Sequence, residues 1–226
     1  MRIKEVFLYL ILIMIQSNLS AQDKGTIIYV GDPMCSWCYG ISNELIQLES
    51  ELSSTYNFEL VVGGLRPGGG DEWNTDFRSF LKHHWEDVAK ASGQRFNYDI
   101  LDLEEFNYDT EPACRSVVVI RDIAPDKAFD WFASVQKGFY YENEDPKNVE
   151  FYKSICEVHN INFQEFKTRF QSEEYVQKTK NDFAIAAQLG VRSFPTILLK
   201  RNDSLSIVAN GFARKSQMVE RISQIK

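Results

Sequence analysis

The fold is decided by residues 26–40, which read TIIYVGDPMCSWCYG. The first five residues are β-branched or apolar and predict a short buried strand. The Gly-Asp-Pro that follows breaks this strand. A helix is expected to begin near Cys35 and to run to about Ser53, because apolar residues recur there at three- and four-residue spacing. Two cysteines with two residues between them therefore lie where a strand gives way to a helix.

The two ends of the chain predict two complementary units. A second strand, Phe58 to Val62, follows the helix and completes a β-α-β unit whose strands should be parallel. Near the C-terminus, residues 196–199 and 205–209 read as strands joined by a polar turn at 200–204. Gly211 is then expected to open a final helix, which gives a β-β-α unit.

The long stretch between these units reads mainly as helix. Helical periodicity covers residues 76–92, 112–123, 128–139, 149–159 and 163–170. Two of these starts carry capping signals: Asn162 with Glu165 resembles a capping box, and Thr110 precedes Pro112 in a first turn. The pattern predicts an α/β protein with a thioredoxin fold and a helical domain inserted between the β-α-β and β-β-α halves. We expect a thioredoxin-like domain at 22–64 and 181–226, and a helical insertion domain at 65–180.

Residues 1–21 have the three parts of a secretory signal peptide. Arg2 and Lys4 precede ten apolar residues at 6–15, and small residues end the segment at Ala21, where cleavage is expected. A membrane anchor is the alternative, but ten apolar residues are fewer than the roughly 20 that cross a bilayer. The protein is therefore expected in the periplasm or otherwise exported, without stable membrane insertion after cleavage. That compartment is oxidising and lets disulfides persist.

The composition limits the class of partner. The chain has 226 residues, 44% of them hydrophobic, which is enough for one large core or one core with a smaller domain. Its formal net charge is −7 at pH 7. An acidic surface argues against nucleic acid and anionic membranes as partners, and it favours a neutral or basic client.

The Cys35-Ser36-Trp37-Cys38 stretch is the candidate catalytic centre. With two residues between them on a first helical turn, the sulfur atoms can reach disulfide distance with little backbone strain. The helix N-terminus stabilises a thiolate at the first cysteine. We expect Cys35 to be the attacking nucleophile and Cys38 to resolve the mixed disulfide, with Ser36 and Trp37 in support.

Other interpretations of the cysteines remain open. A zinc site needs a second pair of ligands, but Cys114 and Cys156 stand alone and the three histidines are not spaced as partners, so no metal or other cofactor is expected. The Cys35–Cys38 pair could instead form an inert structural bridge, although so small a loop stabilises little. A bridge between Cys114 and Cys156 would contribute about 3–4 kcal/mol; the alternative is two buried thiols.

Three stretches carry a resemblance to a known family: residues 31–40, 63–68 (GGLRPG) and 190–196 (GVRSFPT). They resemble the DsbA family, and more narrowly its FrnE-like branch of predicted disulfide isomerases with a Cys-Ser-Trp-Cys centre. The resemblance runs from about residue 26 to the C-terminus, and the stretch at 110–115 also points to this branch. It implies that Cys35 forms or isomerises disulfides in cysteine-containing exported proteins, and that a redox partner resets the dithiol.

The same resemblance gives a role to the Ser193-Phe194-Pro195 stretch. In the family this proline is cis and faces the cysteines, which implies a cis Phe194–Pro195 bond here. This bond would turn the Phe194 backbone outward, where it can pair with a client strand. Phe194, Ser193 and Trp37 are therefore expected to bind the client. The alternative is an ordinary trans proline in a turn before an apolar strand.

The direction of catalysis is left open by the sequence. The better-known oxidases of the family place a histidine between their cysteines, whereas this chain has Ser36 and Trp37. Oxidase, isomerase and reductase activity are therefore all compatible with the site. A glutathione-dependent isomerase or transferase of the kappa-class or hydroxychromene-carboxylate isomerase type is an alternative enzyme, and a client-binding chaperone with a structural Cys35–Cys38 bridge is a non-catalytic one.

Overall fold

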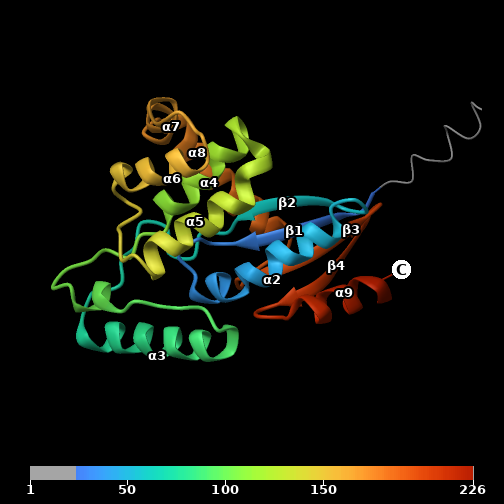
Figure 1. Ribbon diagram of the computed structural model, residues 1–226, viewed down its shortest axis with the longest axis horizontal. Helices are drawn as coiled ribbons and strands as arrows, with labels where there is room; N and C mark the ends of the chain where they lie inside the picture. Colours follow the sequence, from blue (N-terminus) through green and yellow to red (C-terminus); the bar gives the residue numbers. More distant parts are fainter. Residues whose placement is uncertain (1–23, 226) are drawn as a thin grey trace, which may run out of the picture.

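A four-stranded sheet forms the centre of the computed structural model, which describes residues 24–225. The strands are β1 (Thr26–Gly31), β2 (Asn57–Val62), β3 (Thr196–Arg201) and β4 (Ser204–Asn210), in the order β2-β1-β3-β4. The β1 and β2 strands are parallel, whereas β3 runs antiparallel to both β1 and β4 (Figure 1). The predicted parallel pair and the C-terminal hairpin are both present.

The central strand β1 is buried on both faces, which explains its unbroken run of apolar residues. Ile27 and Tyr29 point into the larger hydrophobic cluster, together with side chains of the helices on that face. Ile28 and Val30 alternate to the other face and pack in a smaller cluster with Ala186 of the helix that precedes β3. The sheet is therefore covered on both sides, and its centre is held rigidly.

Eight α-helices are described, and six of them lie between β2 and β3 in the sequence. They are α2 (Ser36–Leu52), α3 (Thr75–Ser92), α4 (Glu111–Ile123), α5 (Ala128–Tyr140), α6 (Tyr152–Val158), α7 (Phe163–Phe170), α8 (Glu173–Gln188) and α9 (Lys215–Gln224). Short 3₁₀ turns lie at Asp99–Asp102, Pro125–Lys127 and Val149–Phe151. This arrangement confirms the predicted α/β class with helices inserted between the two halves of a thioredoxin-type fold (Figure 1). The exact domain boundaries stay a prediction.

An ion pair fastens the inserted helices to the sheet. The Arg121 guanidinium in α4 donates two hydrogen bonds to the Asp182 carboxylate in α8, at 2.7 and 2.8 Å. The same carboxylate accepts the Val62 N–H at the end of β2, at 3.0 Å. Because Asp182 is buried and all of its contacts are charge-assisted, α4, α8 and β2 are held together at one point.

Two details differ from the sequence expectations. The last helix begins at Lys215 and not at Gly211, because Gly211 directly follows β4 and has a left-handed φ of 92°. Thr110 does precede α4, but its side chain caps no N–H of that helix and turns elsewhere. The Asn162 side chain, by contrast, accepts the Glu165 N–H as a cap, as expected.

Within the described part of the chain, no helix is both long and apolar enough to cross a bilayer. The predicted signal peptide at 1–21 lies outside the described residues.

Candidate active site

Cys35 occupies the N-cap position of α2, at the carboxyl end of the central strand. Its side chain is 6% exposed, whereas that of Cys38 is completely buried one turn further along the helix. Both are free thiols, so the dithiol form is the one described. The first turn of α2 contains no acidic residue, so no side chain within the helix opposes the positive end of its dipole at Cys35.

The loop before β3 faces the first cysteine. The Phe194–Pro195 peptide bond is cis, as the family resemblance implied. The Phe194 carbonyl accepts a hydrogen bond from the Cys35 thiol at 3.6 Å. The backbone N–H of Phe194 has no acceptor among the described residues. The Ser193 hydroxyl donates to the Asn210 side chain at 2.7 Å, which fixes the loop against β4. The loop thus presents one unpaired backbone donor beside a sulfur atom.

Gly63, which follows β2, makes room for this loop. A Cβ atom at this position would lie 2.1 Å from two carbons of the Phe194 ring. The ring therefore packs directly on the backbone of residue 63. No larger residue fits there without displacing the Phe194 loop.

A buried carboxylate that the sequence analysis treated only as a strand breaker organises the turn before Cys35. Asp32 Oδ1 accepts the Met34 N–H at 2.8 Å, and Oδ2 accepts the Leu65 N–H at 2.6 Å. Oδ2 also accepts the Thr110 hydroxyl at 2.8 Å and the Cys114 thiol at 3.3 Å. Burial raises the pKa of Asp32, and these four donors offset the effect only in part. The carboxylate joins the turn before α2, the loop after β2 and the start of α4.

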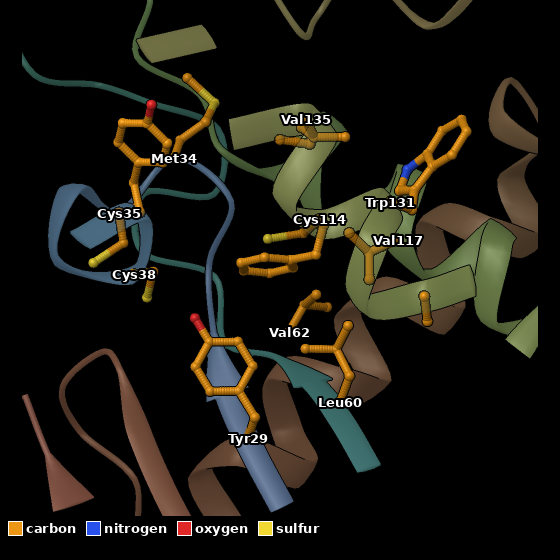
Figure 2. Packing of buried hydrophobic residues seen from close by; sticks show 14 of the residues in the cluster. Tyr29, Met34, Cys35, Cys38, Leu60, Val62, Cys114, Val117, Trp131 and Val135 are labelled. Carbon is orange, nitrogen blue, oxygen red and sulfur yellow. The ribbon is translucent and has the colours of Figure 1, made fainter. Parts of the chain in front are cut away.

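Tyr29 lies beneath the second cysteine. Its hydroxyl points toward Cys38 (Figure 2), is buried, and has no hydrogen-bond partner among the described residues of this dithiol form. A Cβ on Gly31 would lie 2.5 Å from this hydroxyl, so the glycine provides its space. Burial raises the pKa of Tyr29 well above its ordinary value, and the nearby Cys38 adds to the effect. The group therefore remains a neutral hydrogen-bond donor.

A cavity of about 320 Å³ opens beside Cys35. It brings together nearly all of the predicted site residues: Cys35, Ser36, Trp37, Ser193 and Phe194 line it. Cys38 and Pro195 do not line it. The opposite wall comes from α3, through residues that the sequence analysis did not assign to the site, including Phe80 and His84. Phe80 is 48% exposed, which is unusual for a phenylalanine and leaves an apolar surface next to the reactive sulfur.

The other two cysteines are separate free thiols. Cys114 and Cys156 are both fully buried and unbonded to each other. Burial raises the pKa of Cys156 to about 12 and that of Cys114 well above its ordinary value. Within residues 24–225, no three His, Cys, Asp or Glu side chains gather as metal ligands would.

Solved structures give the comparison with known proteins. A Nitrosomonas europaea protein described as a "putative protein disulfide isomerase" is 30% identical over 89% of this chain and 97% of its own, with a TM-score of 0.82. The cytosolic disulfide reductase DsbM of Pseudomonas aeruginosa is 22% identical over 80% of this chain and 88% of its own, with a TM-score of 0.64. DsbA of Chlamydia trachomatis is 14% identical over 88% of this chain and 85% of its own, with a TM-score of 0.58. No protein-family model matches the chain, and no curated protein matches it.

A thioredoxin-type sheet, a Cys-X-X-Cys pair at the start of α2 and a facing cis proline define a thiol–disulfide oxidoreductase of the thioredoxin superfamily. The chain belongs to the DsbA-like family of protein disulfide oxidoreductases. The narrower FrnE-like branch stays a prediction.

Proposed function

We propose that this protein is an exported oxidoreductase that forms or isomerises disulfides in client proteins through Cys35 and Cys38. The observation that carries the proposal is the position of the Cys35 thiol. It lies at the N-terminus of α2, is partly accessible, and contacts the Phe194 carbonyl of the cis-proline loop at 3.6 Å. A client strand that pairs with the free Phe194 N–H would bring its own sulfur beside Cys35.

In the oxidising direction, a client thiolate attacks Cys35 of the Cys35–Cys38 disulfide. The bond between the two enzyme sulfurs breaks, a client–Cys35 bond forms, and Cys38 leaves as a thiolate. A second client thiolate then attacks the client sulfur of this mixed disulfide and releases Cys35. The client loses two electrons and the enzyme gains them, and a redox partner that oxidises the dithiol must complete the cycle.

Cys38 and Tyr29 are assigned to the first step of this exchange, in which Cys38 leaves, and to its reverse, in which Cys38 attacks the mixed disulfide. Burial raises the pKa of Cys38, and the neighbouring Cys35 raises it further, so Cys38 stays protonated in the reduced protein. When Cys35 is tied up in a mixed disulfide, that second cause disappears. The Tyr29 hydroxyl can then donate to the Cys38 thiolate and stabilise it, which gives this otherwise unpaired group a function.

Trapping the intermediate tests the proposal. Cys38→Ser should accumulate a mixed disulfide when it is mixed with a disulfide-bonded client peptide, because Cys35 attacks that disulfide, one peptide thiol leaves, and no resolving thiol remains. The adduct is detected by mass spectrometry. Cys35→Ser is the matched control and should give no adduct at residue 38, which is buried.

Two other outcomes would replace the proposal. Turnover of a small aromatic substrate with glutathione that survives Cys38→Ser would indicate the glutathione-dependent isomerase or transferase, for which the cavity beside Cys35 is the supporting observation. Client binding that is unchanged by Cys35→Ala, without any adduct, would indicate a chaperone.

Export is part of the proposal because the Arg2-to-Ala21 segment has signal-peptide features. The N-terminus of the protein purified from its native cell envelope should be Gln22. Recovery of the uncleaved chain from the cytoplasm would contradict export without affecting the redox chemistry.

A further inference from the structure

The cavity beside Cys35 has a charge opposite to that of the whole protein. The chain carries a net charge of −7, yet the cavity wall includes Arg66 and Arg192 and, among the described residues that line it, no aspartate or glutamate. The positive end of α2 opens at the same place. The net charge favoured a basic client, whereas the local charge favours an acidic one.

Arg66 is fixed in position by its surroundings. Its guanidinium lies 5.1 Å from the centre of the Phe77 ring and 5.9 Å from that of Tyr108. It forms an ion pair with Asp71 at 3.2 Å through Nη1, while its buried Nε has no partner among the described residues. The Arg66 Nε is therefore a donor without a partner among the described residues.

Arg192 is the second arginine of the cavity wall. It is exposed, and within residues 24–225 it makes no ion pair and no side-chain hydrogen bond. It lies two residues before Phe194, on the loop that would hold the client. A full positive charge thus stands beside the client path without an internal counterion.

The cavity opening also exposes apolar side chains. Phe80 and Leu65 are 48% and 39% exposed, and Trp37 lies at the same opening. An extended peptide could place an apolar side chain on this surface and a carboxylate toward the arginines. The cavity therefore matches a client segment in which an acidic residue neighbours the reactive cysteine.

We infer that the site prefers disulfides that carry a carboxylate within about one or two residues of the reacting sulfur. This inference rests on the proposed function, because it requires Cys35 to react with a client. Each exchange is balanced: the reduced protein and one symmetrical peptide disulfide give the Cys35–Cys38 disulfide and two peptide thiols.

The test uses two matched peptide disulfides, the symmetrical dimers of Ac-Ala-Cys-Glu-NH₂ and Ac-Ala-Cys-Lys-NH₂. The second-order rate constant with which each peptide disulfide oxidises the reduced full chain is measured. It is divided by the rate constant with which the same peptide disulfide oxidises dithiothreitol, a neutral dithiol. This division removes the intrinsic reactivity of each peptide. Two unit charges about 7 Å apart in water change a rate roughly threefold. The glutamate peptide should therefore react roughly fivefold or more faster than the lysine peptide at low salt, and added salt should reduce this ratio.

Variants at exposed arginines locate the effect. Because Arg192 attracts the glutamate and repels the lysine, Arg192→Gln should lower the ratio roughly fivefold or more, to near one, and Arg192→Glu should bring it below one. Arg221→Gln, which removes the same charge from the exposed face of α9 outside the cavity, should leave the ratio unchanged.

Two failures are distinguishable. If both peptides react at equal normalised rates, or if Arg192→Gln and Arg221→Gln change the ratio equally, this inference is wrong and the proposed function stands. If neither peptide disulfide oxidises the Cys35–Cys38 pair, the proposed function is wrong, and this inference with it.

Discussion

Replacement of Asp32 by alanine should destabilise the protein strongly. The change leaves the Met34 and Leu65 N–H groups and the Thr110 hydroxyl without the carboxylate that accepts them at 2.6–2.8 Å. Each buried donor that loses its partner costs roughly 1–1.5 kcal/mol, so Asp32→Ala should lower the free energy of unfolding by roughly 3–5 kcal/mol. Asp32→Asn should cost only about 1–2 kcal/mol. The amide oxygen can replace Oδ2, which leaves only the Met34 N–H facing an NH₂ group.

Chemical denaturation followed by tryptophan fluorescence measures both variants. Asp203→Ala, an exposed aspartate in the β3–β4 turn, is the matched control and should change little. Because folding raises the pKa of Asp32, the protonation of this group adds most to the free energy of unfolding at low pH, and this gain is lost as the pH rises through the folded pKa. The wild type should therefore gain stability over Asp32→Asn as the pH falls from neutral. A loss below about 1 kcal/mol in Asp32→Ala would refute the organising role of the carboxylate.

Three further substitutions or modifications address the site. Gly63→Ala should abolish most disulfide exchange, because the new methyl group overlaps the Phe194 ring. It should also lower the free energy of unfolding by roughly 1–3 kcal/mol. Unchanged turnover in an insulin-reduction assay would contradict this. Tyr29→Phe should slow attack by Cys38 on the mixed disulfide at least tenfold, since a hydrogen bond to a charged group is worth about 1.5–3 kcal/mol. It should also raise the pH at which this step begins, without slowing adduct formation. Equal slowing of both steps in stopped-flow traces would argue for a purely structural role. Cys156, with its pKa raised to about 12, should stay unmodified when the native protein is treated with iodoacetamide at pH 8, and its alkylation there, read by peptide mapping, would show that α6 opens.

The local parts of the fold were predictable because their signals are local. A β-branched run, a Gly-Asp-Pro break and helical spacing predict the β1–α2 junction. The observed helix, Ser36–Leu52, lies close to the expected one. The cis bond before Pro195 followed from the family resemblance. The sequence expectation places the start of α9 too early, because Gly211 does not open the helix but follows β4 with a left-handed φ.

The supporting residues of the site were not predictable in the same way. Asp32 binds groups far away in the sequence, and only its bond to the Met34 N–H, two residues ahead, follows the local Asx-turn pattern that a sequence can reveal. The sequence predicts Thr110 as a helix cap, but its hydroxyl donates to Asp32 instead. Arg192 and Phe80 join the cavity only because the topology folds α3 and the cis-proline loop against the same cysteine.

The central claim is that Cys35 and Cys38 form a redox pair, and its most direct test is the reduction potential of that pair. The protein is equilibrated in glutathione buffers, quenched with acid, and assayed for free thiols at each ratio. We predict a reversible two-electron transition in the folded protein between about −120 and −270 mV, with the value distinguishing oxidase, isomerase and reductase. A pair that cannot be reduced and reoxidised without unfolding the protein would be a structural bridge, and this account of the site would be wrong.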